Sequence, residues 1–199
     1  METSGQSYPA TFEVERSDRI DNWRPLVQWL LAIPHLLILN GLQLVARAVA
    51  VVGWFAIVFT GRLPEGLANL LSLYIRYDNR VVAYAGFLRE EYPPFVYEVV
   101  APDPGEYPAV RTGFAPELED RNRLTVGFRI ILVIPQLIVL AFLGIAAIVV
   151  WVIGVFAVLF TGRWPEGLRR FVVGVMRWYT RVEAYLGLLT DEYPPFSLD

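Results

Sequence analysis

The sequence predicts an all-α membrane protein made of two tandem modules, and three observations support this fold class. The chain has 199 residues, of which 55% are hydrophobic. Two internal apolar stretches, from about Pro25 to Thr60 and from about Leu124 to Thr161, are each much longer than the ~20 residues that cross a bilayer as a helix. A set of motifs also occurs twice in the same order. A soluble domain of this size could not bury both stretches, so we expect them to lie in a membrane.

Three motifs of the first half recur in the second half without any change of register. The pairs are Ile33–Leu36 with Ile134–Leu137, Phe59–Leu67 with Phe160–Leu168, and Glu91–Phe95 with Glu192–Phe196. We therefore expect a first membrane module over residues 8–95 and a second over residues 107–199. Between them, residues 96–122 are rich in proline and acidic side chains, which predicts a solvated linker.

Each apolar stretch is long enough for more than one crossing, because ~35 residues make about 50 Å of helix against a hydrocarbon core of about 30 Å. One crossing per module would place Arg62 and Arg163 on opposite membrane faces, whereas two crossings keep both arginines in the cytoplasm. We therefore predict that each module is a membrane helical hairpin followed by an amphipathic interfacial helix, with short extended segments before and after. In the first module the hairpin would turn at Asn40 and Gly41.

The alternative is a single helix kinked at Pro34 and Pro135, whose first part lies in the membrane interface around Trp23, Trp29 and Arg129. The favoured hairpin topology places both termini, the linker and both amphipathic helices on the cytoplasmic side of a multi-pass protein of the cytoplasmic membrane.

The repeated Gly-Arg-x-Pro-Glu-Gly-Leu motif predicts a tight corner between two helices. Gly61 and Gly162 can adopt the positive φ that ends a helix, and Pro64 and Pro165 suit the first turn of the next one. The motif lacks the lysine of a phosphate-binding loop, so we interpret it as structural.

After each corner, apolar residues recur at helical spacing and arginines fall on the opposite side. Such arginines attract anionic lipid headgroups or the carboxylates of a partner protein, although a solvated face without a ligand is the alternative interpretation. The candidate contact residues are Arg76, Arg80, Arg170, Arg177 and Arg181.

Two polar residues inside the first apolar stretch are the intramembrane candidates. His35 follows a proline, where freed backbone groups need hydrogen-bond partners, and Gln136 replaces it in the second module. This replacement argues against a metal site. Arg47, whose counterpart is Ile148, either reaches the interface or lines a substrate pathway.

The sequence offers no support for several other classes of function. There is no cysteine, and the basic residues are dispersed in a chain of net charge −3, so neither thiolate chemistry nor nucleic-acid binding is expected. No serine–histidine–acid set, dinucleotide fingerprint or carboxylate pair occurs in the apolar parts. We therefore expect no metal, no cofactor and no enzymatic activity.

The Tyr-Pro-Pro-Phe motif after each amphipathic helix predicts a trailing segment that folds back onto its module. The prolines forbid continuation of the helix, and Tyr92, Phe95, Tyr193 and Phe196 supply aromatic rings that can anchor the segment. The alternation around Phe12 also predicts a short leading strand that pairs with a trailing segment.

Three parts of the chain resemble one known family. The run Trp23–His35, the Phe-Thr-Gly-Arg-x-Pro-Glu-Gly-Leu corner and the ending Asp191–Leu198 are similar to a bacterial membrane-protein family, the domain of unknown function number four-three-eight-nine. The resemblance covers both modules and implies a membrane protein with two tandem copies. It implies no activity, cofactor or catalytic residue.

Two functions are consistent with these features. We expect a structural or interaction component of the cytoplasmic membrane that contacts the lipid bilayer, including anionic lipids, and membrane-protein partners. The alternative is a transporter or lipid-handling protein with a site between the two repeats, to which Arg47 would contribute.

Overall fold

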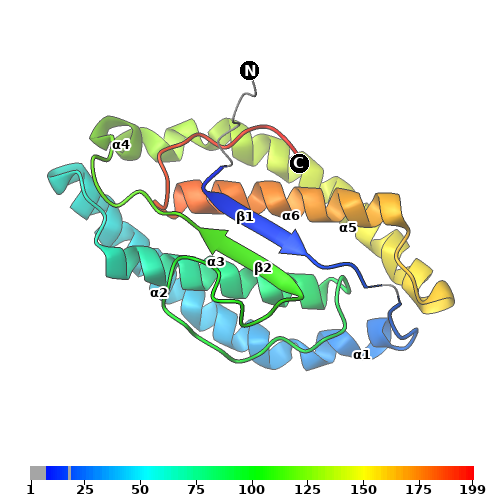
Figure 1. The fold of residues 1–199 in the computed structure, drawn as a ribbon. Coiled ribbons are helices and arrows are strands. Elements are labelled where there is room, and N and C mark those ends of the chain that lie inside the picture. Colours follow the sequence, from blue (N-terminus) through cyan, green and yellow to red (C-terminus); the bar gives the residue numbers. More distant parts are fainter. Residues whose placement is uncertain (1–7, 18) are drawn as a thin grey trace, which may run out of the picture.

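The computed structural model describes residues 8–17 and 19–199, and within them each module contributes one strand and three helices (Figure 1). The first module contains β1 (Ala10–Val14), α1 (Arg24–Leu31), α2 (Ile33–Thr60) and α3 (Glu65–Ala85). The second contains β2 (Val110–Phe114), α4 (Arg123–Leu132), α5 (Ile134–Thr161) and α6 (Glu166–Leu186). The mostly helical fold and its tandem arrangement are confirmed, and the strand predicted around Phe12 is present as β1.

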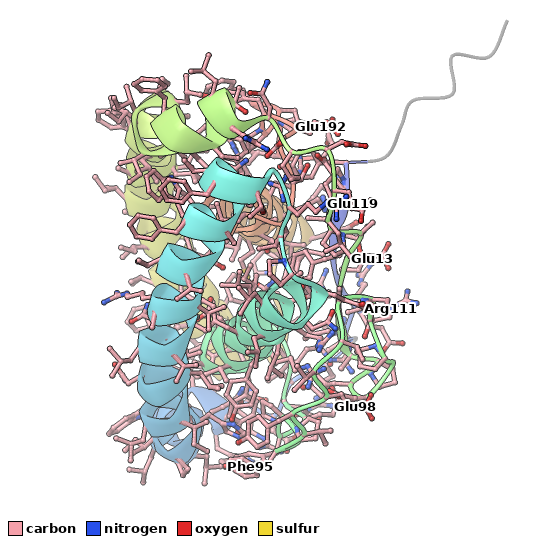
Figure 2. The ribbon with its side chains drawn as sticks, turned by 90° about the vertical axis from the view of Figure 1, so that its left-hand side faces the viewer. Glu13, Phe95, Glu98, Arg111, Glu119 and Glu192 are labelled. Atoms are coloured by element: carbon pink, nitrogen blue, oxygen red, sulfur yellow. The ribbon has the colours of Figure 1, made fainter. Side chains whose placement is uncertain are left out.

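The elements form three layers, which Figure 2 shows edge-on. Helices α1, α2, α4 and α5 make an outer layer, α3 and α6 make the middle layer, and the sheet with the linker makes the third. Charged side chains such as Glu13, Arg111 and Glu119 lie on the sheet side, away from α2. The layers therefore give the molecule one apolar face and one charged face.

The predicted helical hairpin is wrong, because α2 and α5 are each one continuous helix of 28 residues. Asn40 and Gly41 lie inside α2, where the Asn40 amide donates to the Leu36 carbonyl of the preceding turn (2.7 Å) and so supports the helix. The chain bends instead at Ala32 and Val133, just before the two prolines, where α1 and α4 end. The structure therefore shows the break near Pro34 and Pro135 that the kinked-helix alternative predicted, while the membrane placement of the two parts stays a prediction.

Helix α2 buries a single face along its whole length. Its buried residues His35, Ala46, Gly53 and Ile57 follow helical spacing, and they face α3 and α4. The opposite face exposes large apolar side chains from one end to the other, including Leu37, Leu44, Val51 and Phe59. Helix α5 has the same pattern around buried Gln136, Gly154 and Val158. By length and composition, Ile33–Thr60 and the helical stretch Arg123–Thr161 could cross a membrane.

The predicted corners are confirmed in their main feature. Gly61 and Gly162 end α2 and α5 with φ values of 74° and 66°, a left-handed conformation that glycine adopts without strain. Pro64 and Pro165 precede the first residue of the next helix rather than lying in its first turn. Each corner thereby turns the chain from the outer layer into the middle layer.

An approximate two-fold axis relates the modules and runs through the layers (Figure 1). Near the axis, β1 pairs with β2 in antiparallel register, Thr11 opposite Gly113 and Phe12 opposite Thr112. Below them, Thr180 donates to the Asn79 side chain (3.1 Å), and these two residues occupy equivalent positions in α6 and α3. The prediction that the leading strand pairs with a trailing segment is therefore wrong, because the two leading strands pair with each other.

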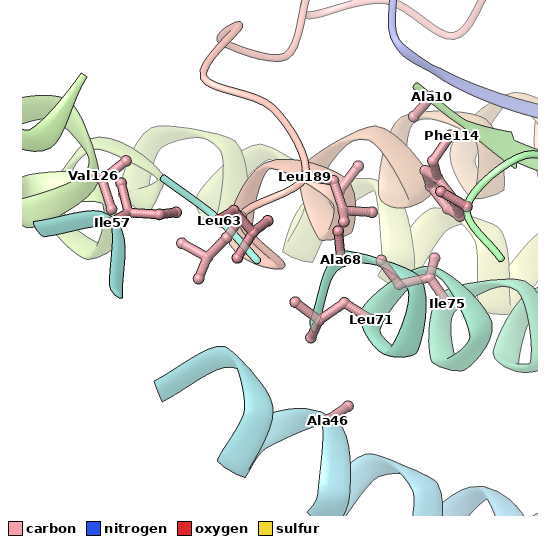
Figure 3. Close-up of a cluster of buried hydrophobic side chains, with 13 residues drawn as sticks. Ala10, Ala46, Ile57, Leu63, Ala68, Leu71, Ile75, Phe114, Val126 and Leu189 are labelled. Atoms are coloured by element: carbon pink, nitrogen blue, oxygen red, sulfur yellow. The ribbon is translucent and has the colours of Figure 1, made fainter. Parts of the chain in front are cut away.

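Each module also completes the corner of the other one. The Ile20 amide donates to the Gly162 carbonyl (2.9 Å), and the equivalent Arg121 amide donates to the Gly61 carbonyl (3.0 Å). A buried apolar cluster joins the modules in the same region, as Figure 3 shows for Ile57 beside Val126 and for Leu63. The modules are therefore interlocked and do not form separate domains.

The predicted linker is not a solvated tether, because it packs on α3. Ala101, Tyr107 and Ala109 are buried, and β2 lies within the same stretch. The physical reason is that α3 presents buried arginines on this side, and their hydrogen-bond requirements are met by linker carbonyls and by Glu106.

The trailing segments fold back onto their own modules, as predicted. In the first module, Phe95 stacks on His35 with ring centroids 4.2 Å apart. In the second module, the Gln136 amide donates to the Pro194 carbonyl (2.5 Å), and Phe196 packs edge-on against Trp178. The two modules thus anchor equivalent segments with different side chains.

Candidate functional site

Three of the five arginines predicted to contact headgroups or partners are buried inside the protein, so that prediction is wrong for them. Arg76 and Arg80 are each 1% exposed, and Arg181 is 4% exposed. Arg76 donates to the carbonyls of linker residues, Arg80 pairs with Glu106 at 2.5 Å, and Arg181 donates to the Asp199 carbonyl. The covering linker and trailing segment could not be read from the helical pattern alone.

The other two arginines, Arg170 and Arg177, lie in a charged cleft of about 580 Å³ beside the start of α6. Besides apolar and small residues, the cleft is lined by six arginines and three glutamates, an excess of positive charge. The charged residues are Arg16, Arg111, Arg163, Arg169, Arg170, Arg177, Glu13, Glu15 and Glu166. We call this site the arginine cleft.

The glutamates of the arginine cleft do not neutralise all its arginines. Glu13 pairs with Arg111 at 2.8 Å, and Glu166 pairs with Arg170 at 3.1 Å. Arg169 has no carboxylate partner among the described residues and donates to the carbonyls of Val14 and Glu15. Burial, and then repulsion by Arg16 and Arg89, lowers the pKa of Arg169. The cleft is therefore suited to an anion.

His35 plays a structural part. It is fully buried, its Nδ1 lies 2.6 Å from the Tyr77 hydroxyl, and its ring stacks on Phe95. In the second module, Gln136 and Trp178 occupy the positions of His35 and Tyr77. The Gln136 side-chain oxygen accepts a hydrogen bond from the Trp178 indole N–H at 2.7 Å. The described residues also contain no group of three or more His, Cys, Asp or Glu placed to hold a metal ion.

Arg47 lies on α2 at the edge of a second hollow, on the apolar face of the molecule. This cavity, of about 260 Å³, lies between α2, α3 and α6. Its lining residues include Gln43, Arg47, Tyr74 and Glu183 together with apolar residues. The Gln43 amide donates to the Tyr74 hydroxyl at 3.2 Å. Arg47 itself forms no ion pair or hydrogen bond with any residue among 8–17 and 19–199. We call this hollow the α2 groove.

Glu183 lines the α2 groove, and Asp78 of the other module lies near enough for its charge to act on Glu183. Asp78 lies one helical turn after Tyr74 on α3, and Glu183 lies one turn after Tyr179 on α6. The Tyr179 hydroxyl donates to Glu183 Oε1 at 2.8 Å, while Glu183 Oε2 is inaccessible to solvent and has no hydrogen-bond partner among the described residues. Asp78 is only 9% exposed and likewise has no partner in the described part of the chain.

The pKa values of these two carboxyl groups are raised by their surroundings. Burial, together with the negative charge of Asp78, raises the pKa of Glu183 above its usual range, against the opposing effect of the Tyr179 hydrogen bond. Burial also raises the pKa of Asp78. A poorly solvated carboxyl such as Glu183, on which a second acid acts, is stabilised by a compensating cation or a proton.

The sequence analysis missed this pair, since it sought two acids within one apolar stretch. The two carboxylates come from different modules, and only packing brings α3 and α6 together. One signal was present in the repeat: Asp78 stands where the second module has Tyr179, and Glu183 stands where the first has Val82. An acid on the otherwise apolar side of an amphipathic helix, in one copy only, marks such a position.

The comparison with known families agrees with the internal repeat. The family described as domain of unknown function DUF4389 matches residues 22–96 and again residues 123–197. The chain belongs to this family. No curated protein and no solved structure is significantly similar to it. Each repeated half of the chain contains one DUF4389 copy, and Asp78 and Glu183 belong to different copies.

The raised pKa values predict that stability falls as the pH rises. A carboxyl whose pKa is higher in the folded state binds its proton more tightly there, so stability is lost between the usual pKa of about 4 and the raised value. In lipid-free detergent we expect each group to contribute up to about 1.4 kcal/mol per pH unit within that window. Glu183→Gln should flatten the thermal-unfolding profile between acid and mildly alkaline pH.

The matched control is Glu65→Gln, an exposed acid at the start of α3, which should keep the wild-type slope. An unaltered pH profile in Glu183→Gln would show that the pair does not titrate in the way the geometry requires.

Proposed function

We propose that the chain is an integral membrane protein with no enzymatic activity, acting as a structural or interaction component of the cytoplasmic membrane of a bacterium. The observation that carries the proposal is the division of the molecule into an apolar face and a charged face. Apolar side chains on the outer layer reach high exposure, 71% at Leu44 and 81% at Phe160. A contiguous apolar surface of this extent is stable only when hydrocarbon or a partner covers it.

The layer geometry favours insertion into one leaflet, with α2 and α5 parallel to the membrane plane. Each helix buries the same face over 28 residues, and the charged layer lies alongside α2 over its whole length in Figure 2. If α2 crossed the bilayer, Glu13, Arg111 and their neighbours would enter the hydrocarbon core, at a cost of several kcal/mol per charge. Insertion parallel to the plane removes this cost, because only the apolar face contacts lipid.

This placement retains the positive-inside argument without requiring hairpins. The two-fold axis then lies along the membrane normal, so both corners and both arginine-bearing helices share one side. Tyr8 and Asp199, the described residues nearest the two ends, lie on the charged side, where they contact Glu192 and Arg181. We propose that this side is the cytoplasm, which short arginine-bearing segments prefer.

The arginine cleft supplies the interaction surface. It lies beside the corner at Arg163 and Trp164, through which the chain leaves the outer layer, so its opening is close to the expected headgroup region. Anionic lipid headgroups, or the carboxylates of a membrane-protein partner, match its unpaired arginines. Of these we propose anionic lipid, because the cleft includes Arg163 and Trp164 of the corner that directly follows the apolar helix α5.

A specific observation also favours the second candidate, a lipid-handling protein with a site between the repeats. The Asp78–Glu183 pair lies where the two modules meet, at a groove that opens on the apolar face. A membrane protein that merely provides a scaffold has no need for a second acid beside Glu183, whose Oε2 is shielded from solvent and has no donor among the described residues.

Thiol labelling tests the placement directly, since the chain has no cysteine of its own. Single cysteines at Glu65 and Glu166, the exposed first residues of α3 and α6, occupy equivalent corners. We expect neither to react with an impermeant thiol reagent in intact spheroplasts, and both to react after permeabilisation. Labelling at only one corner would show inverted modules and contradict the proposal, and labelling at both would place the protein on the outer leaflet.

The arginine cleft is tested by replacing Arg163 and Arg170 with glutamine. Without these charges we expect severalfold less phosphatidylglycerol to co-purify with the protein in mild detergent, because each charge-assisted contact contributes to retention. Arg62→Gln at the equivalent corner of the first module, which lies outside the cleft, is the control. Equal retention by both variants would remove the cleft as a lipid site.

A further inference from the structure

We propose that the α2 groove binds an aminophospholipid of the surrounding leaflet, with its ammonium group at Glu183 and Asp78 and its phosphate beside Arg47. The inference rests on the proposed membrane placement and adds a ligand class to it. It begins from Glu183, whose Oε2 lacks a hydrogen-bond donor among the described residues, and from Arg47, which lacks an anion there.

The groove has the composition that an amphiphile requires. Glu183, Arg47, Gln43 and Tyr74 supply its polar wall, and the remaining lining is apolar, from Ala46 and Ala50 of α2 to Leu71 and Leu186 of the middle layer. A free ion would leave this apolar wall uncovered. A headgroup with attached acyl chains covers both parts at once.

The carboxylate pair requires a cationic hydrogen-bond donor. Glu183 Oε2 is shielded from solvent without a donor, and Asp78 has none either among the described residues. A primary ammonium carries three N–H donors, enough to serve both acids. Tyr74 lines the groove beside Glu183, and the Tyr179 hydroxyl already donates to Glu183 Oε1, which leaves Oε2 for the ammonium group. A quaternary ammonium has no N–H and could not satisfy the two oxygens.

Arg47 supplies the complementary charge for the phosphate. Its guanidinium is exposed at the groove edge and has no counter-ion among residues 8–17 and 19–199. It also lies close enough to the Tyr74 hydroxyl to oppose the rise in the pKa of that group. A cation at the edge and two acids further in match the order of charges in an ethanolamine headgroup.

The orientation of the groove agrees with that of a lipid in the same leaflet. The groove opens on the apolar face, and its acids belong to the middle layer, nearer the charged side. A lipid whose headgroup reaches Glu183 therefore directs its chains toward the bilayer centre, as its neighbours do. Ile148 replaces Arg47 in the second module, so the chain has one such site within the described residues.

The test uses the full chain in nanodiscs that contain equal parts of phosphatidylethanolamine, phosphatidylcholine and phosphatidylglycerol, with retained lipid measured by native mass spectrometry. We expect the wild type to retain phosphatidylethanolamine over phosphatidylcholine by about tenfold, the effect of roughly one charge-assisted hydrogen bond. Glu183→Gln and Asp78→Asn should each remove this preference. Because the ethanolamine and choline lipids share the phosphate, Arg47→Gln should lower the retention of both severalfold without changing their ratio. Neither acid variant should change the retained phosphatidylglycerol.

Glu65→Gln is the control and should retain the wild-type preference. Arg47→Gln keeps the test valid if the core variants unfold, because that side chain is exposed and unpaired. Equal retention of the ethanolamine and choline lipids by the wild type, an intact preference in folded Glu183→Gln, or undiminished retention of the ethanolamine lipid by Arg47→Gln would overturn the inference. Flotation of the wild type with phosphatidylglycerol vesicles tests membrane insertion separately, so a chain that floats without discriminating overturns the ligand alone.

Discussion

Two long apolar helices, each buried along one face only, impose the constraint on which the rest of the structure depends. Helices α2 and α5 bury His35 and Gln136 at one end and Ile57 and Val158 at the other, against the rest of the protein. The opposite faces can be stable only in contact with hydrocarbon or a partner. The charged side chains must then gather on the far side of α3 and α6, and the sheet and linker cover them there.

The two-fold arrangement explains why a duplicated module forms one body. Each module leaves the carbonyl of its glycine corner for the other module to satisfy, through Ile20 and Arg121. The Asn79–Thr180 contact and the β1–β2 pairing close the same interface at the axis. A single module would lack the donor to its corner carbonyl and the partner for its strand. The duplication therefore contributes to stability as well as to symmetry.

Symmetry is kept where side chains support the fold and is broken at the α2 groove. His35 with Tyr77 and Gln136 with Trp178 are chemically different pairs that serve the same buried position. By contrast, Arg47 has no charged counterpart in the second module, and neither Asp78 nor Glu183 has an acidic counterpart in the other module. Charges that occur in one copy only are not needed for the repeated architecture. This asymmetry is the main physical reason for assigning a ligand to the groove.

The sequence predicted the features that depend on local chemistry. The repeat register, the left-handed glycines at Gly61 and Gly162 and the anchored Tyr-Pro-Pro-Phe segments follow from backbone and side-chain preferences over a few residues. The hairpin prediction failed because hydropathy reports length and gives no information about which neighbour buries one face of a helix.

Contacts between distant segments could not be predicted in the same way. Whether Arg76 and Arg80 are exposed to solvent or buried depends on where residues 96–122 pack. Asp78 and Glu183 come near each other only when α3 packs against α6. Neither fact is encoded in helical periodicity. The arginines on the polar side of α3 were therefore read as a free surface, although they form an internal layer.

The most direct test of the one-leaflet arrangement is a depth measurement along α2. Spin labels at Leu37, Leu44, Val51 and Phe59, all on its exposed face, would span about 33 Å of helix. Their relative accessibility to oxygen and to a water-soluble nickel complex in phospholipid vesicles gives the depth of each label. The account predicts four similar depths, within the ~5–10 Å immersion of an interfacial helix. A profile with Leu44 and Val51 deepest and both ends near opposite surfaces would contradict it.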